Sequence, residues 1–119
     1  MHGLTVRWSL DSSDADVMTR LRDYVRDSSH ARFSGMEGLR FKTWRAREGE
    51  WFEGCYVFEN PAERDKFQQS FTTNAPSSPV SQLVGASPML IEPCEVVAVA
   101  EGAAGFLALP TYDDESDPT

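Results

Sequence analysis

The chain has 119 residues, of which 40% are hydrophobic, and it carries 11 Lys and Arg against 19 Asp and Glu. This length suits one domain with a single core. A net charge of −8 argues against a nucleic-acid partner, because such binding depends on Lys and Arg that neutralise phosphates, and no stretch approaches the roughly 18 apolar residues of a membrane span.

The ends of the chain and its cysteines indicate a cytoplasmic protein. The first ten residues lack a basic segment followed by an apolar run, so we expect no signal peptide. Cys55 and Cys94 are too few for a disulfide framework and lack the spacing of metal ligands. Four acids lie in residues 111–119, which we expect to form a disordered tail after a domain of residues 1–110.

The first predicted elements are a strand and a helix. Residues 4–10 alternate between apolar and polar side chains, which predicts a half-buried strand. Apolar residues at spacings of three and four, from Val17 through Val25 to Ser28, predict a helix of about 14 residues. The glycines that follow place residues 33–38 in a connection.

A hairpin and a second helix come next. Residues 39–46 and 51–58 are strand-like and flank a short loop that contains Gly49. Residues 55–58 are apolar on both faces, as in a strand covered on two sides. Asn60 and Pro61 then supply a helix N-cap and a first helical residue, and we expect this helix to end near Thr73.

The last part of the domain is predicted as a loop, a short helical turn over residues 80–84 and a strand over residues 89–100, bent near Pro93. Residues 96–100 are again apolar on both faces. We expect residues 102–110 to form a short extra segment that packs on the domain through Phe106, Leu107 and Leu109.

This order of elements predicts a ferredoxin-like (βαββαβ) α+β fold, in which an antiparallel sheet of order 4-1-3-2 carries two helices on one face. The other face would be bare. Because large exposed apolar patches are unusual in monomers, the doubly apolar runs predict a homodimer with its sheets face to face. The first strand would separate Cys55 from Cys94, so we expect no bond between them.

The stretch from Gly38 to Phe67 resembles the YdhR-like mono-oxygenases of the dimeric α+β barrel superfamily. The matching positions form a Gly, Lys and Trp motif and a Gly-x-Tyr-x-Phe strand: Gly38, Phe41, Lys42, Trp44, Gly54, Tyr56 and Phe58. The Pro- and Ser-rich loop after Phe71 and the acidic tail depart from that pattern. The resemblance implies a dimeric α+β barrel with a pocket between sheet and helices. It also implies cofactor-independent mono-oxygenation of a small aromatic or polyketide-like substrate.

Such a reaction needs a site that binds a flat apolar ligand, stabilises its enolate or phenolate and excludes water, and it needs no cofactor or metal. The candidate substrate-binding residues are Arg7, Trp8, Phe33, Phe41, Trp44 and Tyr56. Arg7, Lys42 or His30 would stabilise the anion or transfer a proton. No residue is assigned as catalytic, and no metal-ligand string is found.

Each of these candidate residues also has a structural interpretation that involves no ligand. Trp8 suits core packing, Trp44 suits a dimer interface or packing, and Tyr56 suits a structural place in a covered strand. Arg7, a permanent charge in a central strand, needs a carboxylate such as Glu53 or Glu95 across the dimer interface, or an anionic ligand. His30 suits a solvent-facing place near a helix end. The alternative functions are a non-catalytic small-molecule-binding dimer of the same fold and a structural dimer whose pocket its own side chains fill.

Overall fold

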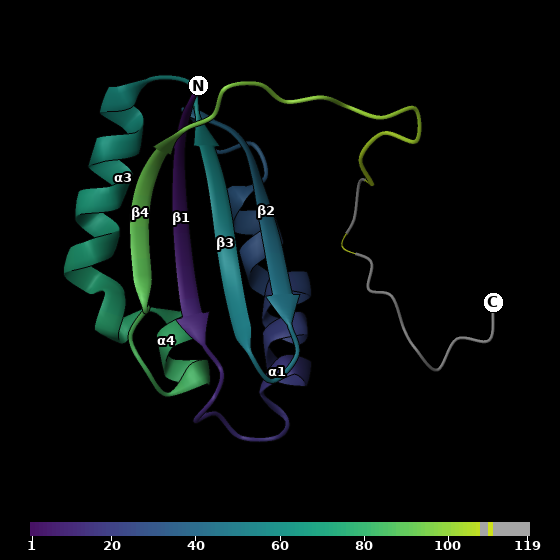
Figure 1. The fold of residues 1–119 in the computed structure, drawn as a ribbon, viewed down its shortest axis with the longest axis vertical. Coiled ribbons are helices and arrows are strands. Elements are labelled where there is room, and N and C mark those ends of the chain that lie inside the picture. The colour runs from purple at the N-terminus through teal and green to yellow at the C-terminus, as the bar shows by residue number, and fades with distance from the viewer. Residues whose placement is uncertain (108–109, 111–119) are drawn as a thin grey trace.

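The computed structural model describes residues 1–107 and Pro110, and within them a four-stranded antiparallel sheet has the order β2-β3-β1-β4. The elements are β1 (His2–Ser9), α1 (Val17–Tyr24), the π-helical turn η1 (Val25–Ser29), α2 (His30–Phe33), β2 (Leu39–Arg47), β3 (Trp51–Phe58), α3 (Pro61–Asn74), the 3₁₀ turn η2 (Ala75–Ser77), α4 (Pro79–Val84) and β4 (Leu90–Glu95). In Figure 1, α1 lies behind β2 and β3, and α3 runs beside β4. The chain is therefore a small α+β domain, consistent with a ferredoxin-like fold.

The core lies between the sheet and the helices. Alternation along β1 buries Leu4, Val6 and Trp8 on the helix-covered face. In β3, Phe52 and Tyr56 lie on the same face and join the same core. The opposite face of the sheet carries no helix within the described residues and is open toward the viewer in Figure 1.

The first helical segment is longer than predicted and contains a π turn. Its buried residues Leu21, Val25, Ser29 and Phe33 follow at spacings of four. The wider π turn adds one residue to the helix, so this spacing stays on one face. Ser29 is therefore buried in place of the predicted Ser28, and Phe33 ends the helix instead of starting the connection.

The hairpin and the second helix follow the predicted boundaries closely. The third strand spans the expected residues 51–58, and the helix after it extends one residue past Thr73. The Asn60 side chain accepts a hydrogen bond from the backbone N of Glu63 at 2.9 Å, as an N-cap does. Phe67 and Phe71 are partly buried and pack this helix on the core.

The last strand is shorter than predicted, and the segment after it leaves the sheet. Strand β4 ends at Glu95, which pairs with His2 at the start of β1. Val96 still exchanges two backbone hydrogen bonds with Met1, at 2.9 and 3.1 Å, and the chain leaves the sheet after it. Val97 and Phe106 are 84% and 71% exposed, and Leu107 is exposed too. Of the side chains expected to pack residues 102–110 on the domain, Phe106 makes one ring contact, with Phe41 at 6.3 Å between centroids, and is otherwise exposed. The prediction is wrong for Leu107, while Leu109 and residues 111–119 lie outside the described residues.

Strand β1 lies between β3 and β4, as predicted, and so separates the two cysteines. Both thiols are free. Among the residues that the structure describes, no helix is long and apolar enough to cross a membrane.

Candidate functional site

A cavity of about 330 Å³ lies between the helix-covered face of the sheet and the helices. Its walls include eight aromatic side chains from three strands and three helices: Trp8, Tyr24, Phe33, Trp44, Phe52, Tyr56, Phe67 and Phe71. The charged lining residues are Arg32 and Lys42, and no Asp or Glu is among its described lining residues. The volume and the apolar walls suit a small, flat molecule.

The cavity exists because α3 packs on the sheet through few side chains. Phe67 and Phe71, four residues apart, form one short apolar stripe, whereas the rest of this 14-residue helix is polar after Pro61 and Ala62 in its first turn. Two aromatic side chains hold the helix above Tyr56 and Trp8 but do not fill the space beside them. Sheet and helices therefore stay apart where Lys42 lies.

Lys42 enters this space from β2, opposite Tyr56 in the register with β3. Its Nζ lies 3.6 Å from the ring centroid of Phe33, 4.4 Å from that of Tyr56 and 4.6 Å from that of Trp44. These contacts are ring faces, which attract a cation. Within the described part of the chain the amine has no hydrogen bond and no ion pair.

Burial lowers the pKa of Lys42 to about 6, and the positive charge of Arg32 acts in the same direction. Desolvation is the largest cause of this shift, and with a pKa of about 6 the amine is mostly neutral at pH 7. Burial also raises the pKa of Tyr56, so that its hydroxyl stays protonated. The cavity therefore holds a neutral amine, Lys42, that can accept a proton, and a protonated hydroxyl, Tyr56, that can donate a hydrogen bond.

Gly54 makes room for both side chains. A Cβ at this position would lie 3.2 Å from Cε of Lys42 and 3.3 Å from Cε1 of Tyr56. Glycine inside a strand weakens the strand and often marks a close approach. Here the side chains of Lys42 and Tyr56 occupy the space over the strand.

Two hydrogen bonds fix the tryptophan walls. Nε1 of Trp44 donates to Oγ of Ser29 at 3.1 Å, and Nε1 of Trp8 donates to Oγ of Ser81 at 3.0 Å. Ser29 belongs to the π turn, and such turns often occur at functional sites. The turn places a polar group beside Trp44 that a regular helix would direct elsewhere.

Four of the six predicted substrate-binding residues line this cavity: Trp8, Phe33, Trp44 and Tyr56. Arg7 and Phe41 do not. Arg7 lies on the open face, because it alternates with Trp8 along β1. Phe41 alternates with Lys42, contacts the ring of Phe106 and borders a smaller cleft of about 230 Å³.

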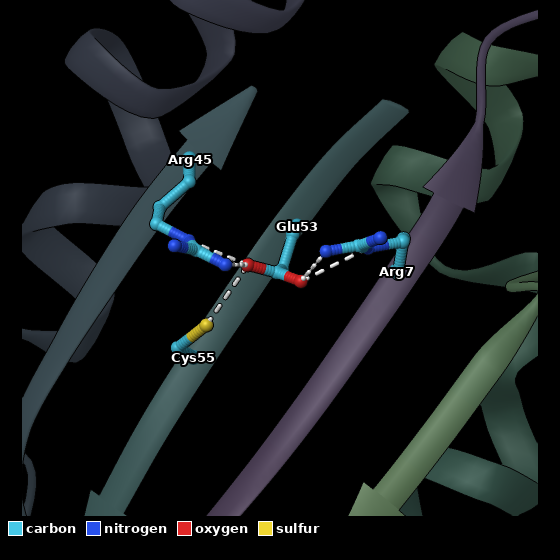
Figure 2. A network of polar contacts seen from close by, with 4 residues as sticks. All are labelled: Arg7, Arg45, Glu53 and Cys55. Carbon is cyan, nitrogen blue, oxygen red and sulfur yellow. Dashed lines mark hydrogen bonds and ion pairs between the residues drawn. The ribbon is translucent and has the colours of Figure 1, made fainter. Parts of the chain in front are cut away.

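The partner of Arg7 is Glu53 of the same chain, directly opposite in the β1–β3 register, and not a carboxylate across a dimer interface. Nε and Nη2 of Arg7 donate to Oε1 of Glu53 at 3.0 and 2.7 Å, and Nε of Arg45 donates to Oε2 at 2.6 Å. The Sγ of Cys55 also donates to Oε2, at 3.1 Å. Figure 2 shows the carboxylate held between the two arginines.

Glu53 is charged despite a side chain that is 1% exposed. Burial alone would raise its pKa, but the bonds from Cys55, Arg7 and Arg45 outweigh burial and lower the pKa. Burial and the nearby carboxylate raise the pKa of Cys55, so this thiol is a weak nucleophile. Arg7, Arg45, Glu53 and Cys55 form an open-face network in which the carboxylate oxygens have their hydrogen-bond donors within the network. This network has a structural character.

Comparison with known proteins gives a fold and no activity. No family profile and no curated protein matches the sequence. The chain is similar in structure to the NE2512 protein of unknown function from Nitrosomonas europaea, with a TM-score of 0.60 and 19% sequence identity over 86% of this chain and 94% of that one. At this identity the likeness shows a shared fold alone.

Several cavity residues were missed from the sequence. Phe67 and Phe71 had a signal, since they are the apolar pair at a spacing of four in a polar helix. Arg32, an exposed residue of α2 whose guanidinium lies 4.8 Å from the Phe33 ring, had none. His30 lines the smaller cleft beside Trp44 and not the main cavity. In the described residues no group of three or more His, Cys, Asp or Glu could hold a metal ion.

Proposed function

We propose that the chain is a cofactor-independent mono-oxygenase of the YdhR-like type, acting on a small aromatic or polyketide-like substrate in this cavity. The observation that carries the proposal is Lys42, a mostly neutral amine enclosed by aromatic rings in a cavity with no described carboxylate. Rings on several sides suit a flat substrate, and an amine suits the removal of an acidic proton.

The reaction class is the conversion of an activated CH₂ group, as in an anthrone, to a carbonyl. The substrate loses a proton, the resulting anion reduces O₂, and a C–O bond forms to give a hydroperoxide. Loss of water from the hydroperoxide leaves C=O, so one oxygen atom enters the product and the other becomes water. The substrate supplies all the electrons. The cavity contributes the base, the flat walls and exclusion of water.

Non-catalytic binding is the second candidate, and Arg32 favours it. Arg32 and Lys42 place two basic side chains in the cavity walls, an arrangement that suits a planar aromatic carboxylate held without turnover. Such a ligand would bind as an anion with uptake of a proton by Lys42.

Oxygen uptake with a panel of anthrones and quinols separates the two functions. A mono-oxygenase consumes one O₂ for each carbonyl formed, and uptake is lost in Lys42→Met. A binder quenches tryptophan fluorescence, through Trp8 and Trp44, without consuming oxygen. Uptake that is equal in Lys42→Met and in the unaltered protein contradicts the assignment of the reaction to this cavity.

We also propose that a second copy of the chain covers the open sheet face. Val97, Val99, Phe106 and Leu107 are exposed in the described subunit, and the segment that carries them extends away from the sheet in Figure 1. Several exposed apolar side chains along one segment support an interface with another chain. The free thiols fit a reducing cytoplasm, where such a dimer would act.

Light scattering of the purified protein tests the dimer. The expected mass is twice the 13.3 kDa of the chain, and Val97→Asp shifts the population toward single chains because a carboxylate would be buried at the interface. Thr72→Asp, on the exposed surface of α3, is the matched control and leaves the mass unchanged. A mass of one chain at micromolar concentration contradicts the proposal.

A further inference from the structure

We propose that Lys42 is the proton acceptor of the cavity and that its ligand is a weak aromatic acid, a phenol or an enol, which binds by transferring its own proton to this amine. The inference rests on the proposed function, because the same cavity must hold the aromatic ligand. It goes further by naming the ionisable group of the ligand and the atom that receives the proton.

The geometry leaves Nζ of Lys42 open to a ligand. The amine lines the cavity, and its contacts there are the rings of Phe33, Trp44 and Tyr56 at 3.6 to 4.6 Å. A ring face is only a weak acceptor for an N–H and supplies no donor for the nitrogen lone pair. A flat phenol lying between the same rings would bring its O–H to the amine and satisfy both groups.

The charged and titratable groups around the amine come from each element that packs against it. They are Tyr24 from α1, His30 and Arg32 from α2, and Cys55 and Tyr56 from β3, whereas α3 contributes the untitratable Phe67, Ser70, Phe71 and Asn74. Arg32 is the permanent cation in this set. In the empty cavity its charge and burial both oppose protonation of Lys42.

An anionic ligand reverses this balance. On transfer the O–H bond of the phenol breaks, its electron pair stays on oxygen, and a new N–H bond forms on Lys42. The cavity gains no net charge, because a phenolate now faces an ammonium. The phenolate also lies near Arg32, whose repulsion of the ammonium it offsets. Lys42 therefore holds a proton when the ligand's negative charge is beside it, and the electron-rich phenolate is the form that reacts with O₂.

Binding of 4-nitrophenol under nitrogen tests the transfer without any oxygenation. The dye is titrated at pH values below its own pKa, where the free dye is colourless and its phenolate is yellow. Bound to the unaltered protein, it is expected to show at least about tenfold more phenolate than the free dye at the same pH, a shift of one pKa unit. In Lys42→Met the bound dye stays in the neutral form.

Two controls separate the base from the cavity. Lys66 is the other lysine of the chain and lies exposed on α3, so Lys66→Met leaves the phenolate fraction unchanged. 4-Nitroanisole has the same ring but no acidic proton, so it binds to the unaltered protein and to Lys42→Met alike.

The possible results distinguish the two proposals. If 4-nitroanisole binds but bound 4-nitrophenol stays neutral, or ionises equally in Lys42→Met, the role of Lys42 is overturned and the aromatic cavity stands. If neither compound binds to the unaltered protein, aromatic binding in this cavity is overturned together with the proposed function. Ionisation that depends on Lys42, without oxygen uptake from any anthrone, supports the inference and contradicts the mono-oxygenase.

Discussion

Lys42 and Glu53 are ionisable residues on neighbouring strands, and they lie on opposite faces of the sheet; Lys42 is partly buried and Glu53 is fully buried. Glu53, on the open face, accepts hydrogen bonds from two arginines and a thiol. Lys42, on the helix-covered face, meets ring faces. Glu53 thus stays charged because it has hydrogen-bond donors around it, whereas Lys42 is mostly neutral because it is desolvated and has no such partner among the described residues.

We interpret Glu53 as a structural charge and Lys42 as a functional group. Removing one partner of a buried, well-bonded charge destabilises the fold strongly, because the remaining charge is left without compensation. A buried amine without partners lowers stability, and such groups gather at functional sites because the unusual protonation state is useful there. The next two experiments measure these opposite effects on the free energy of unfolding.

Replacing Glu53 is expected to have the largest effect. Glu53→Ala leaves Arg7 and Arg45 facing each other without the carboxylate, and we expect a loss of about 3 kcal/mol in the free energy of unfolding at pH 7, the low end for a buried pair because both arginines are partly exposed. Urea denaturation measures it. Glu50→Ala removes an exposed pair with Arg47 and should cost less than about 0.5 kcal/mol. Equal losses in the two variants would contradict a structural role for the open-face network.

Replacing Lys42 should change the pH dependence of stability. Its folded pKa of about 6 lies below the ordinary value of 10.5, so between these values the unfolded chain binds more protons and stability rises with pH. We expect Lys42→Met to remove a slope of about 1.4 kcal/mol per pH unit, or about 2 kcal/mol between pH 7 and 8.5. Thermal and urea unfolding of both proteins across this range gives the difference. Parallel curves would show that Lys42 keeps its ordinary pKa.

Local patterns in the sequence predict much of the fold. The third strand, the Asn60 cap and the alternation in β1 depend on neighbouring residues, so periodicity and capping chemistry predicted them correctly. The end of β4 does not depend on its own residues. It depends on where β1 begins, and the apolar run after Glu95 therefore predicted a longer strand than the sheet can pair.

The candidate site was predicted less completely for the same reason. The pattern around Trp44 drew attention to Lys42 but could not distinguish it from Arg7 and His30, because their environments arise from segments far apart in the sequence. The π turn decides that Ser29 and Phe33 face the cavity, and strand register decides that Arg7 meets Glu53 on the other side. Neither the π turn nor the strand register can be predicted from the local pattern of residue types.

Gly54→Ala should have the smallest effect on stability and a clear effect on binding. Alanine restricts the unfolded chain, a gain of up to about 1 kcal/mol, which the crowding of its Cβ against Lys42 and Tyr56 offsets. The new Cβ meets Cε of Lys42, which belongs to a flexible side chain. The lysine side chain can therefore move away from the methyl group, and it moves into the cavity. We expect 4-nitroanisole to bind several-fold more weakly, whereas Gly102→Ala, in open space, leaves binding unchanged.

The same substitution in a Lys42→Ala background decides which neighbour is displaced. Lys42→Ala is used here because methionine would keep a Cε in the same place, whereas alanine removes the atom that lies 3.2 Å from the new methyl group. If Lys42 is what Gly54 accommodates, the loss of 4-nitroanisole affinity on Gly54→Ala disappears in this background, and the two changes are strongly non-additive. An equal loss in both backgrounds would place the crowding on Tyr56, and Gly54 would then serve the aromatic wall instead of the amine.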